Sequence, residues 1–102
     1  VEFAAAGLKD EAPQVWRRLG QEAMLLGDVE DAIWYFRRAV ELDGRIPAVW
    51  QMLGRCFEEI QDEPRARDCY HLASRLLTRG SSAGWDPEAL SLLWDFPEPH
   101  EA

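Results

Sequence analysis

The side chains that most often perform catalysis are few in this sequence, and none of them belongs to a recognisable site. The two His residues are His71, which follows Tyr70, and His100 near the end of the chain. No motif places a Ser or Cys nucleophile beside either one, and the sequence has no Gly-rich phosphate loop or paired metal ligands. The two Cys residues, Cys56 and Cys69, are expected to be buried free thiols in a reduced compartment. We therefore predict that the protein is not an enzyme and has no cofactor and no metal site.

Arg and Gln side chains at helical spacing suggest a different chemistry, the recognition of an acidic group. Arg17 and Gln21 are four residues apart, and so are Gln51 and Arg55. Residues at this spacing share one face of a helix. Because a guanidinium group can donate two parallel hydrogen bonds to one carboxylate, such a face suits an acidic or carboxylate group of a partner. The alternative is that these residues form only a solvated helix face.

The charge and hydropathy of the chain argue against other partners. The formal net charge is −8 at pH 7, and residues 81–102 contribute −5 of it. Nucleic acid and anionic membrane surfaces both require a basic surface, so neither is expected as a partner. No apolar run approaches the roughly 20 residues that a membrane-spanning helix needs, so membrane insertion is not expected. The sequence begins with Val1 and shows no secretory signal, and we interpret it as a fragment of a cytoplasmic protein.

The elements that must position these residues are two copies of one pattern. Residues 47–80 repeat residues 13–46 with a shift of 34 positions. The ten identical pairs are Pro13/Pro47, Val15/Val49, Trp16/Trp50, Leu19/Leu53, Gly20/Gly54, Asp28/Asp62, Ala32/Ala66, Ala39/Ala73, Leu42/Leu76 and Arg45/Arg79. A fixed period of this size indicates stacked structural repeats.

Within each copy, apolar residues recur every three or four positions, which predicts two helices. The expected helices span residues 13–26, 29–42, 47–60 and 63–78, and a shorter fifth helix spans 87–95. Gly27 can adopt the left-handed conformation that ends a helix, and Asp28 and Asp62 are expected to cap the helices that follow. Gly20 is expected where two helix backbones approach closely. Residues 79–84 are expected to form a flexible break.

The period and its fixed residues resemble the tetratricopeptide repeat, a helix–turn–helix unit. The residues that carry the resemblance are Trp16, Leu19, Gly20, Ala23, Ala32, Phe36 and Ala39 in the first copy, and Trp50, Leu53, Gly54, Phe57, Ala66, Tyr70 and Ala73 in the second. The sequence departs from the family at Gly44 and Thr78, where the family usually has Pro, and at Ala23, where a larger residue is usual. The resemblance implies an all-α fold, with antiparallel helical hairpins stacked as a short right-handed α-solenoid. We expect a C-terminal capping helix in addition.

In this family the first helices of successive repeats line a concave groove. The resemblance therefore implies a protein–protein interaction module, a scaffold or adaptor that binds a partner peptide or helix in this groove. The groove residues that it implies are Gln14, Arg17, Gln21, Met24, Gln51, Arg55 and Glu58. One branch of the family binds the C-terminal carboxylate of heat-shock chaperones with Lys and Asn residues. Because this sequence has no Asn and no complete third repeat, that specificity is not expected.

The chain is expected to divide into three parts. Residues 1–12 are an N-terminal segment, interpreted as the remnant of a preceding repeat helix, and residues 13–80 are the two repeats. Residues 81–102 are a linker, a capping helix and an acidic tail.

This last part has two interpretations. Its helix covers the open edge of the fourth helix with Leu90, Leu93 and Trp94, or helix and tail reach another copy, where Glu98 or Glu101 meets the groove arginines. The second interpretation makes self-assembly, or docking within a larger solenoid, the alternative function.

Trp34 occupies a position where the family usually has a polar residue. An exposed Trp there would be an anchor for a partner. The alternative is that Trp34 packs beneath the N-terminal segment around Phe3, and we favour this second interpretation.

Overall fold

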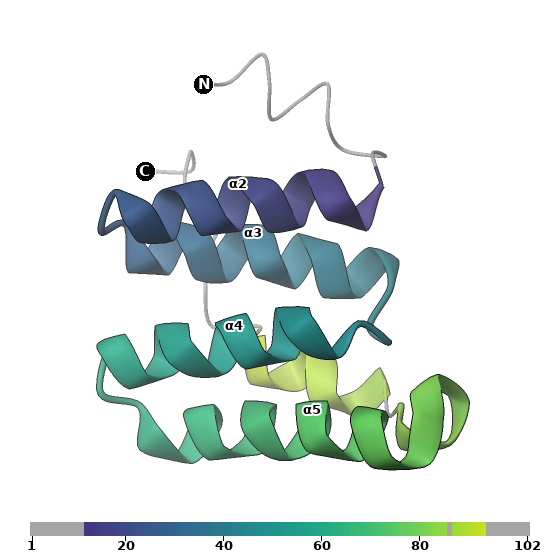
Figure 1. Ribbon diagram of the computed structural model, residues 1–102. Helices are drawn as coiled ribbons and strands as arrows, with labels where there is room; N and C mark the ends of the chain where they lie inside the picture. The colour runs from purple at the N-terminus through teal and green to yellow at the C-terminus, as the bar shows by residue number, and fades with distance from the viewer. Residues whose placement is uncertain (1–11, 86, 94–102) are drawn as a thin grey trace.

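Residues 12–85 and 87–93 are described by the computed structural model, and they form helices and turns without any strand. The helices are α2 (Pro13–Leu25), α3 (Val29–Leu42), α4 (Pro47–Glu59), α5 (Glu63–Gly84) and the 3₁₀ helix η1 (Pro87–Leu93). They are stacked in chain order from α2 to α5, and η1 lies behind α4 in this view (Figure 1). None of these helices is long and apolar enough to span a lipid bilayer.

The helices form two antiparallel hairpins. α2 packs mainly on α3, and α4 packs mainly on α5. α3 also packs on α4 and thereby joins the hairpins. Pro13 and Pro47 begin the first helix of each hairpin, where a missing backbone N–H leaves no helical hydrogen bond unmade. The predicted all-α fold of stacked helical hairpins is confirmed.

The chain reverses direction inside each hairpin at a turn that contains one residue with a left-handed backbone conformation. Gly27 has a φ of 84°, as expected, and Gln61 has a φ of 63° at the equivalent place. The Asp62 side chain caps α5 by accepting a 3.3 Å hydrogen bond from the backbone amide of Arg65. The predicted cap at Asp28 is wrong, because this side chain makes no hydrogen bond to the start of α3.

The glycines of the first helices accommodate aromatic rings. A Cβ atom at Gly20 would lie 2.6 Å from the Phe36 ring, and one at Gly54 would lie 2.8 Å from the Tyr70 ring. The space that Gly20 leaves is thus taken up by the Phe36 ring. Each glycine leaves room for the aromatic side chain that the second helix of its own hairpin packs against the first.

The predicted flexible break at residues 79–84 is instead a helical turn that folds back on α5. Gly80 interrupts the helix with a φ of 87° and a ψ of 164°. The Gly84 carbonyl then accepts a 3.0 Å hydrogen bond from Nε of Arg75. A Cβ atom at Gly84 would lie 2.7 Å from the Arg75 carbonyl oxygen, so the two segments are in direct contact.

Trp85 connects the C-terminal segment to the junction between the hairpins. A Cβ atom at Gly44 would collide with the Trp85 ring. The centroid of this ring is 6.1 Å from that of Trp50, and the Trp50 indole donates a 2.9 Å hydrogen bond to the Gly44 carbonyl. The Pro that is usual at this repeat position is therefore replaced by Gly where the ring of Trp85 needs the space.

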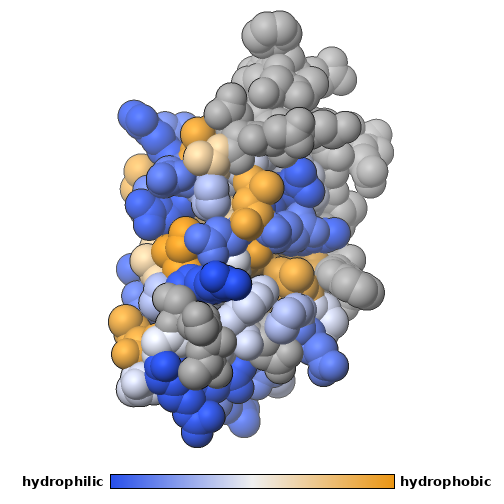
Figure 2. Space-filling model, turned by 90° about the vertical axis from the view of Figure 1, so that its right-hand side faces the viewer, coloured by the Kyte–Doolittle hydropathy of each residue, from blue (hydrophilic) through white to orange (hydrophobic). Residues whose placement is uncertain are grey.

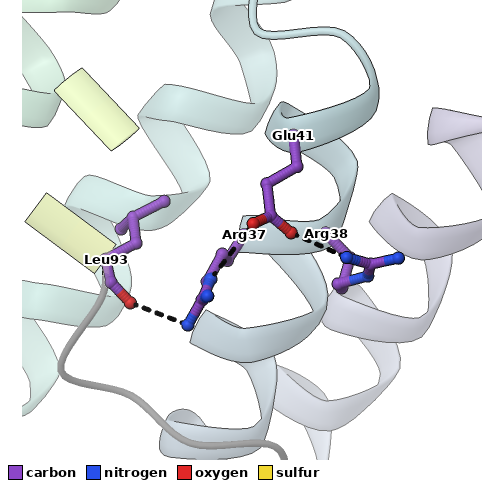
Figure 3. Close-up of polar contacts among 4 residues, drawn as sticks. All are labelled: Arg37, Arg38, Glu41 and Leu93. Carbon is purple, nitrogen blue, oxygen red and sulfur yellow. Dashed lines mark hydrogen bonds and ion pairs between the residues drawn. The ribbon is translucent and has the colours of Figure 1, made fainter. Parts of the chain in front are cut away.

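The fifth helix packs mainly on α3 and not, as expected, over the edge of α5. Leu93 is completely buried. Arg37 of α3 lies between Glu41 and the end of η1 (Figure 3). Its Nη1 atom donates a 3.4 Å hydrogen bond to the Leu93 carbonyl, and its Nε atom is 3.5 Å from the Glu41 carboxylate. Trp85 and residues 87–93 thus pack on the helices of their own chain.

Several expectations concern residues that the structure does not describe. They are the helix before Pro13, the contact of Trp34 with Phe3, the contact of Trp94 with α5, and the reach of the acidic tail with Glu98 and Glu101.

Candidate protein-binding surface

The predicted binding residues lie on α2 and α4, the first helices of the two hairpins. Together they form what we call the α2–α4 surface: Gln14, Arg17, Gln21 and Met24 on α2, and Gln51, Arg55 and Glu58 on α4. The two helices meet where the Cys56 thiol donates to the Met24 thioether, with 3.3 Å between Sγ and Sδ. The last turns of α2 and α4 therefore lie side by side.

Most of the α2–α4 surface is accessible to a partner. The exposed residues are Gln14, Gln21, Gln51, Arg55 and Glu58, whereas Arg17 and Met24 are partly buried. The other faces of the same helices carry core residues, among them Trp16 and Trp50 at 1% and 0% exposure. The amphipathic pattern thus presents the polar residues to solvent, as their spacing predicts.

The positive charge of this surface comes from Arg17 and Arg55. Over residues 12–85 and 87–93, the structure records no ion pair for either guanidinium group. The acidic residue of the surface, Glu58, accepts a 2.7 Å hydrogen bond from the Tyr70 hydroxyl on α5. Burial, and then this hydrogen bond, raise the pKa of Tyr70 to about 12, so the phenol stays a donor at neutral pH. Glu58 is therefore held by α5.

Trp34 belongs to an aromatic cluster of Trp16, Trp34 and Tyr35. Trp16 and Trp34 meet edge to face with ring centroids 5.6 Å apart, and Trp16 and Tyr35 are stacked at 6.2 Å. The Arg38 guanidinium lies 5.6 Å from the Trp16 ring and 5.9 Å from the Trp34 ring. Trp34 is half-buried and forms part of this cluster. The sequence analysis did not identify Tyr35 and Arg38 as neighbours of Trp34. Both residues follow Trp34 closely on the same helix.

The two thiols are buried and unsuited to nucleophilic chemistry at neutral pH. Cys56 and Cys69 are both completely buried and free. Burial raises the pKa of each thiol to about 12. Because the thiolate is the reactive form, both groups stay protonated and inert near pH 7. In the part of the chain that the structure describes, no group of three His, Cys, Asp or Glu residues could hold a metal ion.

A cleft of about 510 Å³ lies at the end of the molecule where α2 begins and α3 ends. It is bordered by Pro13, by residues 40–45 at the end of α3, and by Trp85 and Leu90. Figure 2 views this end of the molecule, where hydrophobic patches lie among hydrophilic ones. The sequence did not predict this cleft, because its walls come from three separate parts of the chain, and one of them includes the contact of Trp85 with Gly44.

Comparison with known proteins adds one finding. A family model described as tetratricopeptide repeat matches residues 13–56, which cover the first repeat and the start of the second. No curated protein and no solved structure matches the chain.

Proposed function

We propose that this chain is a protein–protein interaction module that binds a peptide or helix of a partner protein along the α2–α4 surface. The match of residues 13–56 to the tetratricopeptide repeat model supports this role. The observation that supports this site is a pair of arginines, Arg17 and Arg55, for which residues 12–85 and 87–93 provide no ion pair. They lie on two helices that meet at Met24 and Cys56. Repeat proteins of this family generally act as non-catalytic scaffolds, and we propose the same role for this chain.

The partner segment that fits this surface carries acidic groups. Arg17 and Arg55 can each donate paired hydrogen bonds to a carboxylate. Gln14, Gln21 and Gln51 can donate to, or accept from, the backbone of an extended or helical peptide. Glu58 is already bonded to Tyr70 and would repel a carboxylate that approached the last turn of α4. The acidic groups of the partner should therefore lie nearer to Arg17 and Arg55 than to Glu58.

A peptide-binding experiment tests this proposal. Fluorescein-labelled peptides with acidic residues at varied positions are screened by fluorescence anisotropy against the whole chain, and the tightest is titrated at low and high salt. We expect the double variant Arg17→Ala/Arg55→Ala to bind at least about tenfold more weakly, since each charge-assisted hydrogen bond contributes roughly 1.5–3 kcal/mol.

The matched control is Arg18→Ala/Arg67→Ala. It removes the same charge from exposed positions outside the α2–α4 surface. We expect this control to keep nearly the affinity of the parent chain. Equal loss in both double variants would mean that binding reports only overall charge, and unchanged affinity in both would remove the arginines from the site. Circular dichroism spectra must show that both variants remain helical.

A further inference from the structure

Three large apolar side chains are exposed at the end of the molecule that holds both hairpin turns. Leu25 and Leu26, at the end of α2, are 87% and 77% exposed, and Ile60, at the end of α4, is 36% exposed. Both turns lie at the left of Figure 1. The contact of the Met24 thioether with the Cys56 thiol joins the two helices shortly before these ends. The three side chains therefore come from neighbouring helices and lie at one end of the molecule.

The fold does not require these exposed side chains. The buried residues of α2 are Trp16, Gly20 and Ala23, and they lie on another side of the helix. At the position equivalent to Leu25, α4 carries the exposed Glu59, so a charged side chain is accepted there. A single exposed Leu is ordinary on a protein surface, whereas several apolar side chains gathered at one place mark an interaction site.

Acidic residues border these apolar side chains in both turns. Residues 19–36 contain four acidic residues and no basic one, and so do residues 56–64. The exposed acidic residues are Glu22, Asp28, Glu30, Glu58, Glu59 and Glu63. Over residues 12–85 and 87–93, the structure records an ion pair for Glu22, at 3.9 Å from Arg18, and none for the other five. This end of the molecule is therefore both apolar and negatively charged.

The combination of apolar side chains and negative charge selects one kind of partner. A protein segment with apolar side chains flanked by Lys or Arg matches the surface in both respects. Nucleic acids and the anionic surfaces of membranes would be repelled. A second copy that docked through the same residues would place two acidic borders opposite each other, and like charges at an interface are unfavourable.

We propose that Leu25, Leu26 and Ile60 form a docking site, the turn surface, for a partner segment whose apolar side chains are flanked by Lys or Arg. This site goes beyond the proposed function, because it does not use Arg17 or Arg55 and takes a segment of the opposite charge. The apolar contacts provide most of the affinity, and the acidic border guides the basic segment to them. The three side chains already stand outside the core, so the site is present before the partner binds.

Three fluorescein-labelled peptides test the proposal on the whole chain. The first is an amphipathic peptide of Leu and Lys, about 14 residues long, with Leu at helical spacing. The second has Glu in place of every Lys, and the third has Ser in place of every Leu. We expect the first peptide to bind at least about tenfold more tightly than either of the others in fluorescence anisotropy. Its affinity should fall as the salt concentration rises.

Two variants of the chain locate the binding site. Leu25→Ser/Leu26→Ser should bind the Leu/Lys peptide about tenfold or more weakly, because it removes two of the three apolar contacts. The matched control Leu42→Ser/Leu77→Ser makes the same change at side chains outside the turn surface that are 42% and 63% exposed. It should keep nearly the affinity of the parent chain. Circular dichroism spectra must show that both variants remain helical.

Several results would overturn the proposal. They are equal losses in the two leucine variants, equal affinity for the Lys and Glu peptides, or a Kd above about 1 mM for the Leu/Lys peptide. Arg17→Ala/Arg55→Ala should bind this peptide at least as tightly as the parent chain, since it removes positive charge. A loss there would place the peptide on the α2–α4 surface and overturn the proposal. A dimer of the parent chain that Leu25→Ser/Leu26→Ser abolishes in sedimentation analysis would assign the turn surface to a second copy, with the same consequence.

Discussion

At the level of single residues, the hydrogen bond between Tyr70 and Glu58 links the proposed binding surface to α5. The hydroxyl and carboxylate oxygens are 2.7 Å apart. Burial raises the pKa of Tyr70 to about 12, and the hydrogen bond to Glu58 adds to the shift. The unfolded chain releases this proton near pH 10 and the folded chain only near pH 12. The folded state therefore loses stability as the pH rises through this window.

We predict that Glu58→Gln lowers the pKa of Tyr70, because the acceptor loses its negative charge while the burial of the ring stays. The titration can be followed by the absorbance of tyrosinate near 295 nm. The chain has two Tyr residues, so the measurement uses a Tyr35→Phe background in which only Tyr70 titrates. Glu59→Gln, which removes a neighbouring exposed carboxylate, is the control. An unchanged Tyr70 titration in Glu58→Gln would show that the hydrogen bond is not formed in solution.

At the level of helices, the starts of α3 and α5 differ although an Asp residue precedes each helix. Asp62 accepts hydrogen bonds from the amide and the guanidinium of Arg65, whereas the side chain of Asp28 makes no capping bond. We predict that Asp62→Ala lowers the free energy of unfolding by about 1 kcal/mol. Asp28→Ala should change it by less than about 0.5 kcal/mol. Urea unfolding followed by circular dichroism measures both values, and similar losses at the two sites would contradict the difference.

The repeat pattern predicts helices best where the contacts that form them are local. The spacing of apolar residues located four helices with their first residues correct, and it placed Gln51 and Arg55 on a solvent-facing side. It could not locate the end of α5, because the turn after Gly80 is held by the contact of Gly84 with Arg75. The pattern also did not predict the hydrogen bond of Glu58 to Tyr70. This bond joins two helices, and the repeat period does not determine how one helix is rotated relative to the other.

At the level of the whole molecule, η1 and Trp85 join the two hairpins by contacts that the period does not contain. Leu93 is completely buried, and α3 holds its carbonyl through Arg37. We predict that Leu93→Ala lowers the free energy of unfolding by about 2–4 kcal/mol, as for other large buried side chains that are cut back to Ala. The control Leu77→Ala removes a side chain that is 63% exposed and should cost less than about 0.5 kcal/mol.

Chemical denaturation of these two variants should be followed both by circular dichroism and by Trp fluorescence. Coincident transitions would show that the hairpins and the C-terminal segment unfold together. A Leu93→Ala chain as stable as the parent would place the C-terminal segment outside the cooperative unit.

The contact of Trp85 with Gly44 has a consequence for consensus design, in which a residue is replaced by the one most frequent at its position. A designer who followed the tetratricopeptide repeat pattern that this sequence resembles would place Pro at position 44 and would expect a more rigid turn and a gain in stability. Here the Pro ring would displace Trp85 and would disturb its tilted contact with the Trp50 ring. The residue that is most frequent in a repeat pattern is thus a poor choice at a position where a side chain from elsewhere in the chain fills the space.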